Sequence, residues 1–300
     1  MTNVQIERVD LSEPRYTYGG DDYIFVELSE AMSFDANFLA QAITQRIRSR
    51  DLPGILEVAP ANASYLVQFD PTQRDPETLL AELQAIKQEI DIQEYTWDAN
   101  VIEIPVFYND PWTHETLMQF RDRHQAPDST DLEYCAEIND FDSIEDLIDA
   151  HSGAPHMATM IGFVPGLAWC FQMVPRDRQL EAPKYKRPRT DTPGRAIGFG
   201  GAFTTPYPVQ GAGGYQLFGR TPVEVLDVEQ SLPQFEDSIV LPDPGDILVF
   251  SQIDREEYNS IREEIEVGTY EYNIEEIEFV PDEFFENPDV YNKNIMEAIE

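Results

Sequence analysis

Short apolar runs of β type, separated by glycine and proline, fill the chain from Met157 to Phe250. Glycine and proline supply the turns between short strands. This pattern is typical of a β-barrel with long loops. The run from Gly245 to Phe250, GDILVF, predicts a closing strand.

The part of the chain before the barrel has a different pattern. After a loose polar lead-in at residues 1–18, strands and helices alternate, and Leu39, Ile43 and Ile47 recur every four residues on one helix face. Asp75-Pro76 gives a cap and a first-turn proline to the second helix. The predicted strands are residues 23–28, 55–59, 65–69 and 101–107, with helices after the first and third. This β-α-β-β-α-β order is the split pattern of ferredoxin-like domains.

The predicted architecture is therefore α+β, with three segments. Residues 1–100 form a small ferredoxin-like α/β domain, residues 101–253 the barrel domain, and residues 254–300 a helix, a strand from Tyr270 to Phe279 and an acidic end. Within the barrel segment, Thr113 is expected to cap one helix and Ser143 another.

The net charge is −37, from 57 acidic and 20 basic residues. Only four of the bases are lysines, namely Lys87, Lys184, Lys186 and Lys293. Such an excess of acid repels itself unless salt screens it, so we expect a halophilic source; an acidic protein of ordinary salt is the alternative. The charge also disfavours nucleic acid and anionic membranes as partners. With no signal-like stretch and no long apolar run, the expected location is the cytoplasm.

Several kinds of site lack their sequence signals. Cys135 and Cys170 give neither a disulfide framework nor a zinc site, and Cys170 is expected to be a core thiol. The histidines have no metal-ligand spacing, so no metal is predicted and each is expected to be isolated, on the surface or in the core; they are His114, His124, His151 and His156. There is no phosphate-binding loop, dinucleotide fingerprint or nucleophile elbow.

One stretch of this acidic chain is basic. Between Pro175 and Arg195 there are seven bases and three acids, a net charge of +4, and two of the four lysines lie there. The bases are Arg176, Arg178, Lys184, Lys186, Arg187, Arg189 and Arg195. The segment predicts a site for a carboxylate or another oxyanion; the alternative is a surface patch paired with neighbouring acids.

Three glycine clusters flank this basic segment. They are GFVPG at Gly162–Gly166, GFGG at Gly198–Gly201 and GAGGY at Gly211–Tyr215. Glycine permits close approach of the backbone to a ligand, and the N–H groups of such turns can bind anions. Ordinary tight barrel turns are the alternative interpretation.

These same segments carry a resemblance. The motifs are GFVPG at 162–166, PRT at 188–190, Pro193, Gly200-Gly201 and GGYQLFGRTP at 213–222, with supporting matches near Gly20-Asp21, Pro53–Ile55 and Tyr65–Pro71. Together they resemble the allophanate hydrolase subunit 1 family, also called the carboxyltransferase C and D subdomain family, over roughly residues 15–280. The family includes the 5-oxoprolinase B subunit, sporulation-kinase inhibitors and half of the urea carboxylase carboxyltransferase domain.

Two branches of that family are represented. NDPWT at 109–113, Lys184-Tyr185 and the added helix and strand after Asp254 resemble the urea carboxylase branch, whereas GFVPG resembles the oxoprolinase branch. In urea-type members an aspartate stands at the position of Phe163. A phenyl ring cannot accept hydrogen bonds from urea nitrogens, so the acceptor substrate stays open.

The resemblance implies a cyclophilin-like barrel beside the small α/β domain. It implies a carboxyltransferase half that pairs with a sister A/B subunit and moves CO₂ from carboxybiotin to a urea-like or amide nitrogen of a small-molecule substrate. The chain has no Met-Lys-Met biotin-attachment sequence, no ATP-binding loop and no amidase Ser-Ser-Lys pattern. Carboxybiotin would therefore come from a partner carrier and biotin carboxylase chain, and this chain would bind no cofactor itself. Alternatives are the B subunit of an ATP-dependent 5-oxoprolinase, a non-enzymatic kinase-inhibitor-like protein, or a barrel domain without activity.

The candidate site residues follow from the basic and glycine-rich segments. Those expected to hold the carboxylate in transfer are Lys184, Arg187 and Arg189. Those expected to bind substrate are Phe163, Pro165, Gly200, Gly201, Gly213, Gly214, Tyr215, Gln216 and Arg220. Backbone N–H groups of the glycine turns are expected to stabilise negative charge on the biotin ureido group.

Overall fold

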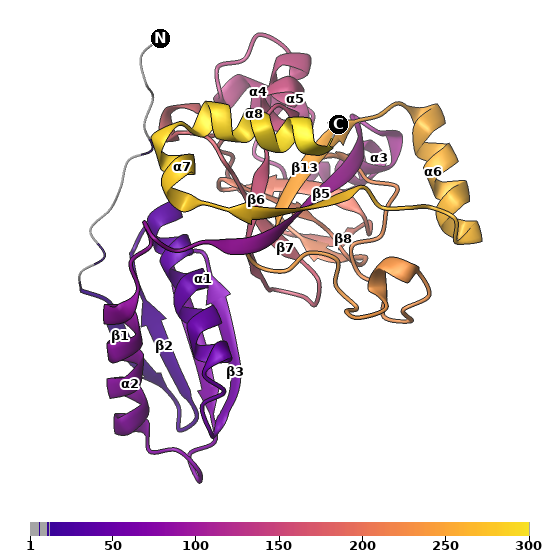
Figure 1. Cartoon of the computed structure of the whole chain (residues 1–300). Helices are drawn as coiled ribbons and strands as arrows, with labels where there is room; N and C mark the ends of the chain where they lie inside the picture. The colour runs from indigo at the N-terminus through magenta and orange to yellow at the C-terminus, as the bar shows by residue number, and fades with distance from the viewer. Residues whose placement is uncertain (1–5, 7–10, 12, 300) are drawn as a thin grey trace. The chain divides into compact units, whose positions relative to one another are not determined.

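The protein is described by a computed structural model that covers residue 6, residue 11 and residues 13–299 (Figure 1). The chain forms two compact units. Unit 1 contains residues 1–99 and 278–288, and unit 2 contains residues 100–277 and 289–300. None of the described helices is long and apolar enough to cross a membrane.

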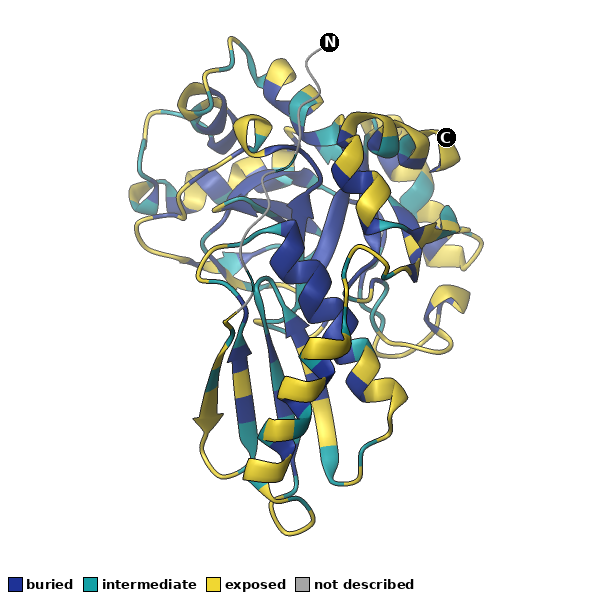
Figure 2. Cartoon of the chain, turned by 60° about the vertical axis from the view of Figure 1, so that its left-hand side comes forward, coloured by how far each residue is buried: buried dark blue, intermediate teal, exposed yellow. Residues whose placement is uncertain are grey.

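Unit 1 is a four-stranded antiparallel sheet with two helices packed on it. The strand order is β1-β2-β4-β3, with β1 Arg15–Gly19, β2 Tyr23–Glu27, β3 Ile55–Ala61 and β4 Ser64–Phe69. Buried and less buried residues alternate along β2 and β4 (Figure 2), and the buried ones pack against α1, Phe34–Ser49, and α2, Pro76–Glu89. Asp75 caps α2 through the Thr78 N–H, as the Asp75-Pro76 pair predicts.

The ferredoxin-like arrangement expected for this unit is not confirmed. Residues 101–107, its predicted last strand, lie instead within β5, Trp97–Tyr108, which runs into the unit 2 sheet. This segment is buried on both faces, so strands or side chains must cover both of its sides. Residues 15–18, assigned to the polar lead-in, are also not a loose lead-in, since they belong to β1 and pair with β2.

Unit 2 is built on a closed barrel of seven strands. The strand order β12-β9-β10-β7-β6-β13-β5 closes because β12 also pairs with β5, and β14, Ile274–Phe279, extends the sheet beside β5. The remaining strands are β6 His156–Ile161, β7 Ala168–Gln172, β9 Ala196–Gly200, β10 Phe203–Pro206, β12 Gln216–Arg220 and β13 Ile247–Gln252. The predicted barrel is confirmed. The strand at 245–250 is β13, but the ring closes between β12 and β5.

The barrel interior contains two histidines among phenyl rings. His151, on α5 at Ile144–Ser152, bridges the Tyr108 hydroxyl at 2.8 Å and the Thr204 hydroxyl at 2.8 Å. Its ring lies 4.9 Å from that of His156, and both side chains are buried. Burial lowers the pKa of His151 to about 3 and that of His156 well below its ordinary value. The barrel therefore requires both rings to be neutral.

The helices around the barrel begin at well-formed caps. The N-cap of α3, Pro111–Phe120, is Asp110, whose carboxylate accepts from the N–H groups of Trp112 and Thr113, so the expectation that Thr113 is the cap is wrong. Ser143 caps α5, as predicted. The remaining elements of unit 2 are α4 Asp131–Ile138, β8 Arg189–Thr192, β11 Gly211–Gly213, α6 Arg255–Val267 and α8 Pro288–Ile299. The short helix α7, Pro281–Glu286, belongs to unit 1.

Candidate functional site

The basic segment ends in a fully buried arginine. Arg189 opens β8, which pairs with β11 so that Arg189 lies opposite Gly213. Its guanidinium lies 4.5 Å above the Tyr185 ring, and Nε donates to the Thr192 hydroxyl at 3.2 Å. Within the described part of the chain, neither Nη1 nor Nη2 has an acceptor in hydrogen-bonding geometry. A buried guanidinium is thus left with most of its donors unused.

Gly213 is glycine because a tyrosine occupies the space beside it. A Cβ atom there would lie 2.5 Å from the Tyr207 hydroxyl oxygen and 2.8 Å from Oγ1 of Thr192. Burial raises the pKa of Tyr207, and the Arg189 guanidinium opposes that rise. The missing side chain therefore allows the Tyr207 hydroxyl to lie beside the buried charge.

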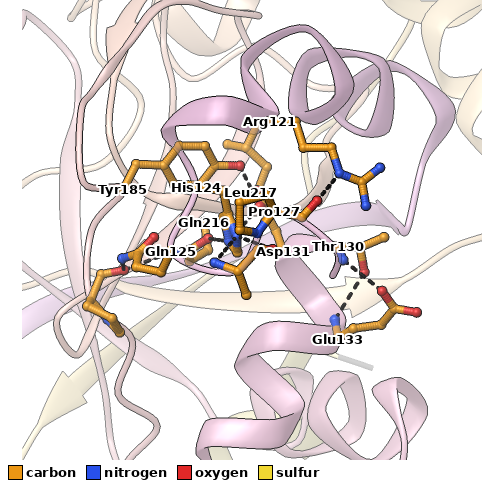
Figure 3. A network of polar contacts seen from close by, with 12 residues as sticks. Arg121, His124, Gln125, Pro127, Thr130, Asp131, Glu133, Tyr185, Gln216 and Leu217 are labelled. Carbon is orange, nitrogen blue, oxygen red and sulfur yellow. Dashed lines mark hydrogen bonds and ion pairs between the residues drawn. The ribbon is translucent and has the colours of Figure 1, made fainter.

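A buried carboxylate lies next to this arginine. Asp131, in the first turn of α4, accepts from the Tyr185 hydroxyl at 2.5 Å and from the Leu217 N–H at 2.7 Å (Figure 3). Burial raises the pKa of Asp131, while the Tyr185 bond and the charge of Arg189 oppose that rise. Asp131 and Arg189 therefore influence each other, but no direct ion pair joins them among the described residues. We call Arg189, Tyr185, Tyr207, Thr192 and Asp131 the Arg189 cluster.

His124 and Gln216 complete the polar network that Figure 3 shows. Nε2 of His124 faces two acceptors, Oε1 of Gln216 at 2.9 Å and Oδ1 of Asp131 at 3.4 Å, so we infer that this nitrogen carries a hydrogen. The Gln216 amide nitrogen donates to the Pro183 carbonyl at 2.7 Å. Both ends of the Gln216 side chain are therefore already bonded within the protein.

Lys184 lies at the surface over two aromatic rings. Its Nζ is 5.6 Å from the centre of the Trp169 ring and 5.1 Å from that of Tyr215, a cation–π arrangement. A Cβ at Gly200 would overlap the Tyr215 ring, so glycine at this position allows that ring to lie against β9. The Tyr215 hydroxyl is buried and has no hydrogen-bond partner in the described structure.

The other bases of the segment are paired on the surface. Arg187 bonds to Asp122 at 2.6 Å, Arg176 to Glu181 at 2.6 Å, and Arg178 to Asp289, with every side chain well exposed. For these arginines the structure agrees with the patch interpretation. In contrast, Lys184, Lys186 and Arg189 form no ion pair with any described carboxylate.

Four predicted site residues lie apart from the Arg189 cluster or are already bonded. Phe163, with φ +77° and 71% exposure, and Pro165 lie in the β6–β7 turn. Arg220 stacks on the Trp112 ring at 5.4 Å and donates to the Gly194 carbonyl. The Gly201 N–H donates to the Ala182 carbonyl at 2.6 Å, so it cannot serve a ligand as expected. Among described residues, no hydrogen bond, ion pair or ring contact joins Phe163, Pro165 or Arg220 to the cluster.

The remaining glycine of the prediction supports the backbone. The Gly214 carbonyl accepts from the Tyr185 N–H at 2.7 Å, which holds Tyr185 next to the cluster. The residues that sequence reasoning missed are Tyr185 as a ring partner, Tyr207, Asp131 and His124. Asp131 lies within a Thr130–Glu133 capping box, which marks a helix start but gives no sign of a site.

Comparison with known proteins places this fold and its site in a family. A family model described as carboxyltransferase domain, subdomain C and D, matches residues 14–235. The chain belongs to this carboxyltransferase family. The B subunit of a Bacillus subtilis 5-oxoprolinase is 26% identical over 254 residues, which are 82% of this chain and 95% of that protein. A urea amidolyase of Saccharomyces cerevisiae is 28% identical over 289 residues, 93% of this chain.

The relatives differ greatly in length from this carboxyltransferase C and D chain. It spans only 16% of the yeast urea amidolyase. Among solved structures, the urea carboxylase of Kluyveromyces lactis matches with a TM-score of 0.81 at 24% identity over 98% of this chain and 26% of that chain. The K. lactis urea amidolyase gives a TM-score of 0.82. These likenesses establish the fold.

Proposed function

We propose that this chain forms one wall of a carboxyltransferase site that moves CO₂ from carboxybiotin to a urea-like or amide nitrogen. A sister A/B subunit would form the facing wall. Membership of the carboxyltransferase C and D family supports the reaction class, and the yeast urea amidolyase supports the acceptor class. Biotin carboxylation would belong to partner chains.

The observation that carries this proposal is the environment of Lys184. In a chain with 57 acidic residues, it is an exposed cation with no carboxylate partner within the described structure, lying over Trp169 and Tyr215. Gly200 lets the Tyr215 ring lie against β9 beneath it. An unpaired cation above aromatic rings is suited to a ligand that joins a flat surface to a negative charge.

These residues fit a carboxylated ureido ring, which is flat and anionic. Carboxybiotin would supply the carboxyl group, whose bond to a ring nitrogen breaks as one to the acceptor nitrogen forms, while the acceptor's proton passes to biotin. Lys184 would orient the carboxylate and balance its charge. The Tyr215 hydroxyl, which has no partner in the described structure, is available as a donor. Gln216 would shape the wall, since both of its ends are bonded to His124 and Pro183.

The proposal is tested by Lys184→Met in a complex reconstituted in high salt with the sister chain and a biotinylated carrier. We expect carboxylation of a urea or amide acceptor to fall about 100-fold or more, because a group aimed at developing charge is lost. Lys293→Met is the matched control, since Lys293 is exposed on α8 and paired with Glu297 at 3.2 Å. Equal turnover in the two variants would remove Lys184 from the site.

The B subunit of an ATP-dependent 5-oxoprolinase is the second candidate. It is favoured because this chain spans 95% of the B. subtilis protein of that name. The two functions separate cleanly in one assay of the complex purified from its source. ATP-dependent opening of 5-oxoproline without any biotinylated chain would favour oxoprolinase and contradict carboxyl transfer.

A further inference from the structure

Arg189 presents an electrostatic imbalance that the fold itself does not resolve. Its side chain is fully buried, only Nε donates a hydrogen bond, and both terminal nitrogens lack acceptors within the described structure. The neighbouring carboxylate of Asp131 is directed to Tyr185 and the Leu217 N–H instead. Buried charges are ordinarily paired and hydrogen-bonded. The two free nitrogens form half of a planar fork that lacks its acceptor.

A short loop covers this arginine. We call residues 183–188 the strap. Tyr185 is its only buried residue, and the Tyr185 ring lies against the guanidinium while its hydroxyl bonds to Asp131. The rest of the strap is exposed and includes Lys184, Lys186 and Arg187. The strap therefore holds its place on Arg189 through one side chain.

The other attachments of the strap are polar contacts to its backbone. Tyr185 N–H bonds to the Gly214 carbonyl at 2.7 Å, and three side chains from outside the strap bond to its carbonyls. These are Gln125 with Pro183 and Lys184, Gln216 with Pro183, and Arg123 with Pro188. Water can replace such contacts, and segments with few buried apolar side chains open at low free-energy cost.

We propose that Arg189 is the receptor for a planar carboxylate-type anion, which reaches it when the strap lifts Tyr185 away. The class includes carboxylate, carbamate and bicarbonate, whose paired oxygens match the Nη1 and Nη2 donors of a guanidinium. The Tyr207 hydroxyl, placed beside Arg189 by the absence of a side chain at Gly213, is a further donor. The cations of the strap attract the anion toward Arg189 from an otherwise acidic surface.

The identification of this anion with the carboxyl group in transfer rests on the proposed function. Binding itself does not require turnover, so the two fail separately. A protein that binds the anion at Arg189 but never carboxylates an acceptor would keep this site and contradict the transfer. A protein that turns over while Arg189 binds no anion would do the reverse.

The first experiment compares stability with and without formate. Thermal unfolding is followed at fixed ionic strength while formate replaces chloride, in the wild type and in Arg189→Met. We expect formate to raise the wild-type Tm and to leave Arg189→Met unchanged. We also expect the formate-free Tm of Arg189→Met to exceed that of the wild type, because an uncompensated buried charge is replaced by an apolar chain.

The control for this experiment is Arg176→Met, which removes the same charge from an exposed side chain paired with Glu181. It should respond to formate as the wild type does. A lower Tm in Arg189→Met with an unchanged formate response would identify Arg189 as a structural residue and overturn the site. If Arg189→Met does not fold, Arg189→Lys keeps the charge without the fork and should lose the formate response.

The second experiment tests the strap in the unaltered protein. Phenylglyoxal modifies accessible guanidinium groups, and peptide mapping gives the modification rate of each arginine. Arg189 should react more slowly than Arg176, formate should protect it, and Tyr185→Ala should accelerate its reaction about tenfold or more because the cover is removed. Absence of formate protection, or equal Arg189 rates with and without the Tyr185 ring, would overturn the proposal.

Discussion

At the scale of single residues, two glycines and one arginine determine the candidate site. Gly200 and Gly213 leave space that Tyr215 and Tyr207 occupy, and those tyrosines in turn face Lys184 and Arg189. In the sequence, the glycine clusters indicate either anion-binding backbone or tight turns. The structure shows a third use at these two positions, which is close packing of an aromatic ring or hydroxyl against the backbone.

Gly200→Ala tests this packing. The added Cβ would overlap the Tyr215 ring, so we expect a loss of about 1–3 kcal/mol in the free energy of unfolding and displacement of the ring beneath Lys184. Gly211→Ala is the control, since a Cβ there meets nothing within 4 Å. Chemical denaturation of both variants decides the point. A Gly200→Ala protein as stable as Gly211→Ala would show that Tyr215 moves aside freely.

At the scale of elements, the barrel is held partly by a polar bridge across its interior. His151 from α5 joins Tyr108 of β5 to Thr204 of β10, and Phe250 and Phe218 pack against its ring. The histidine pattern in the sequence indicates only isolated surface or core residues. The structure shows that His151 and His156 lie together and depend on staying neutral.

This bridge predicts a loss of stability in acid. The folded pKa of His151 is about 3, below the unfolded value of about 6.5, so the unfolded chain binds more protons between those pH values. The contribution is complete above about pH 6.5 and declines as pH falls toward 3, by about 2 kcal/mol at pH 5. The buried carboxyl groups of Asp110, Asp131 and Asp246 have raised pKa values and act in the opposite direction.

Urea denaturation of the wild type and of His151→Gln between pH 7 and pH 4 measures this effect. The variant should be less stable at pH 7, because it loses the bridge, but its stability should fall less steeply in acid. Parallel curves for the two proteins would show that His151 is not the titrating group.

At the scale of the whole molecule, charge dominates. A net charge of −37 opposes any compact state through self-repulsion, and the surface pairs of Arg176, Arg178 and Arg187 offset little of it. Salt shortens the range of this repulsion to about 3 Å at 1 M. The acidic composition is therefore expected to set the conditions under which the fold is stable.

We expect the Tm to rise steadily between 0.1 M and about 2 M KCl, because screening removes repulsion that is larger in the folded state. Scanning calorimetry across this range measures it, with a matched series in sucrose to separate screening from preferential exclusion. A Tm that is constant or falls with KCl would contradict the salt-adapted interpretation of the composition.

The sequence by itself determined the barrel, the helix positions and the family, because turn residues, apolar periodicity and chained motifs are local signals. It also located the basic segment, and with it Lys184 and Arg189. Only the tertiary structure separated these two from Arg187, which is paired on the surface, and from Arg220, which stacks on Trp112.

The tertiary structure also decided which strand belongs to which unit. Residues 101–107 are strand-forming in either setting, and partners distant in the chain, β12 and β13, place them in the barrel. The same holds for Asp131 and Tyr207, which reach Arg189 from α4 and from the loop after β10. Burial and pairing between distant segments depend on the whole fold, and no local pattern encodes them. The buried, unpaired charge of Arg189 is for this reason a property of the fold and not of its motif.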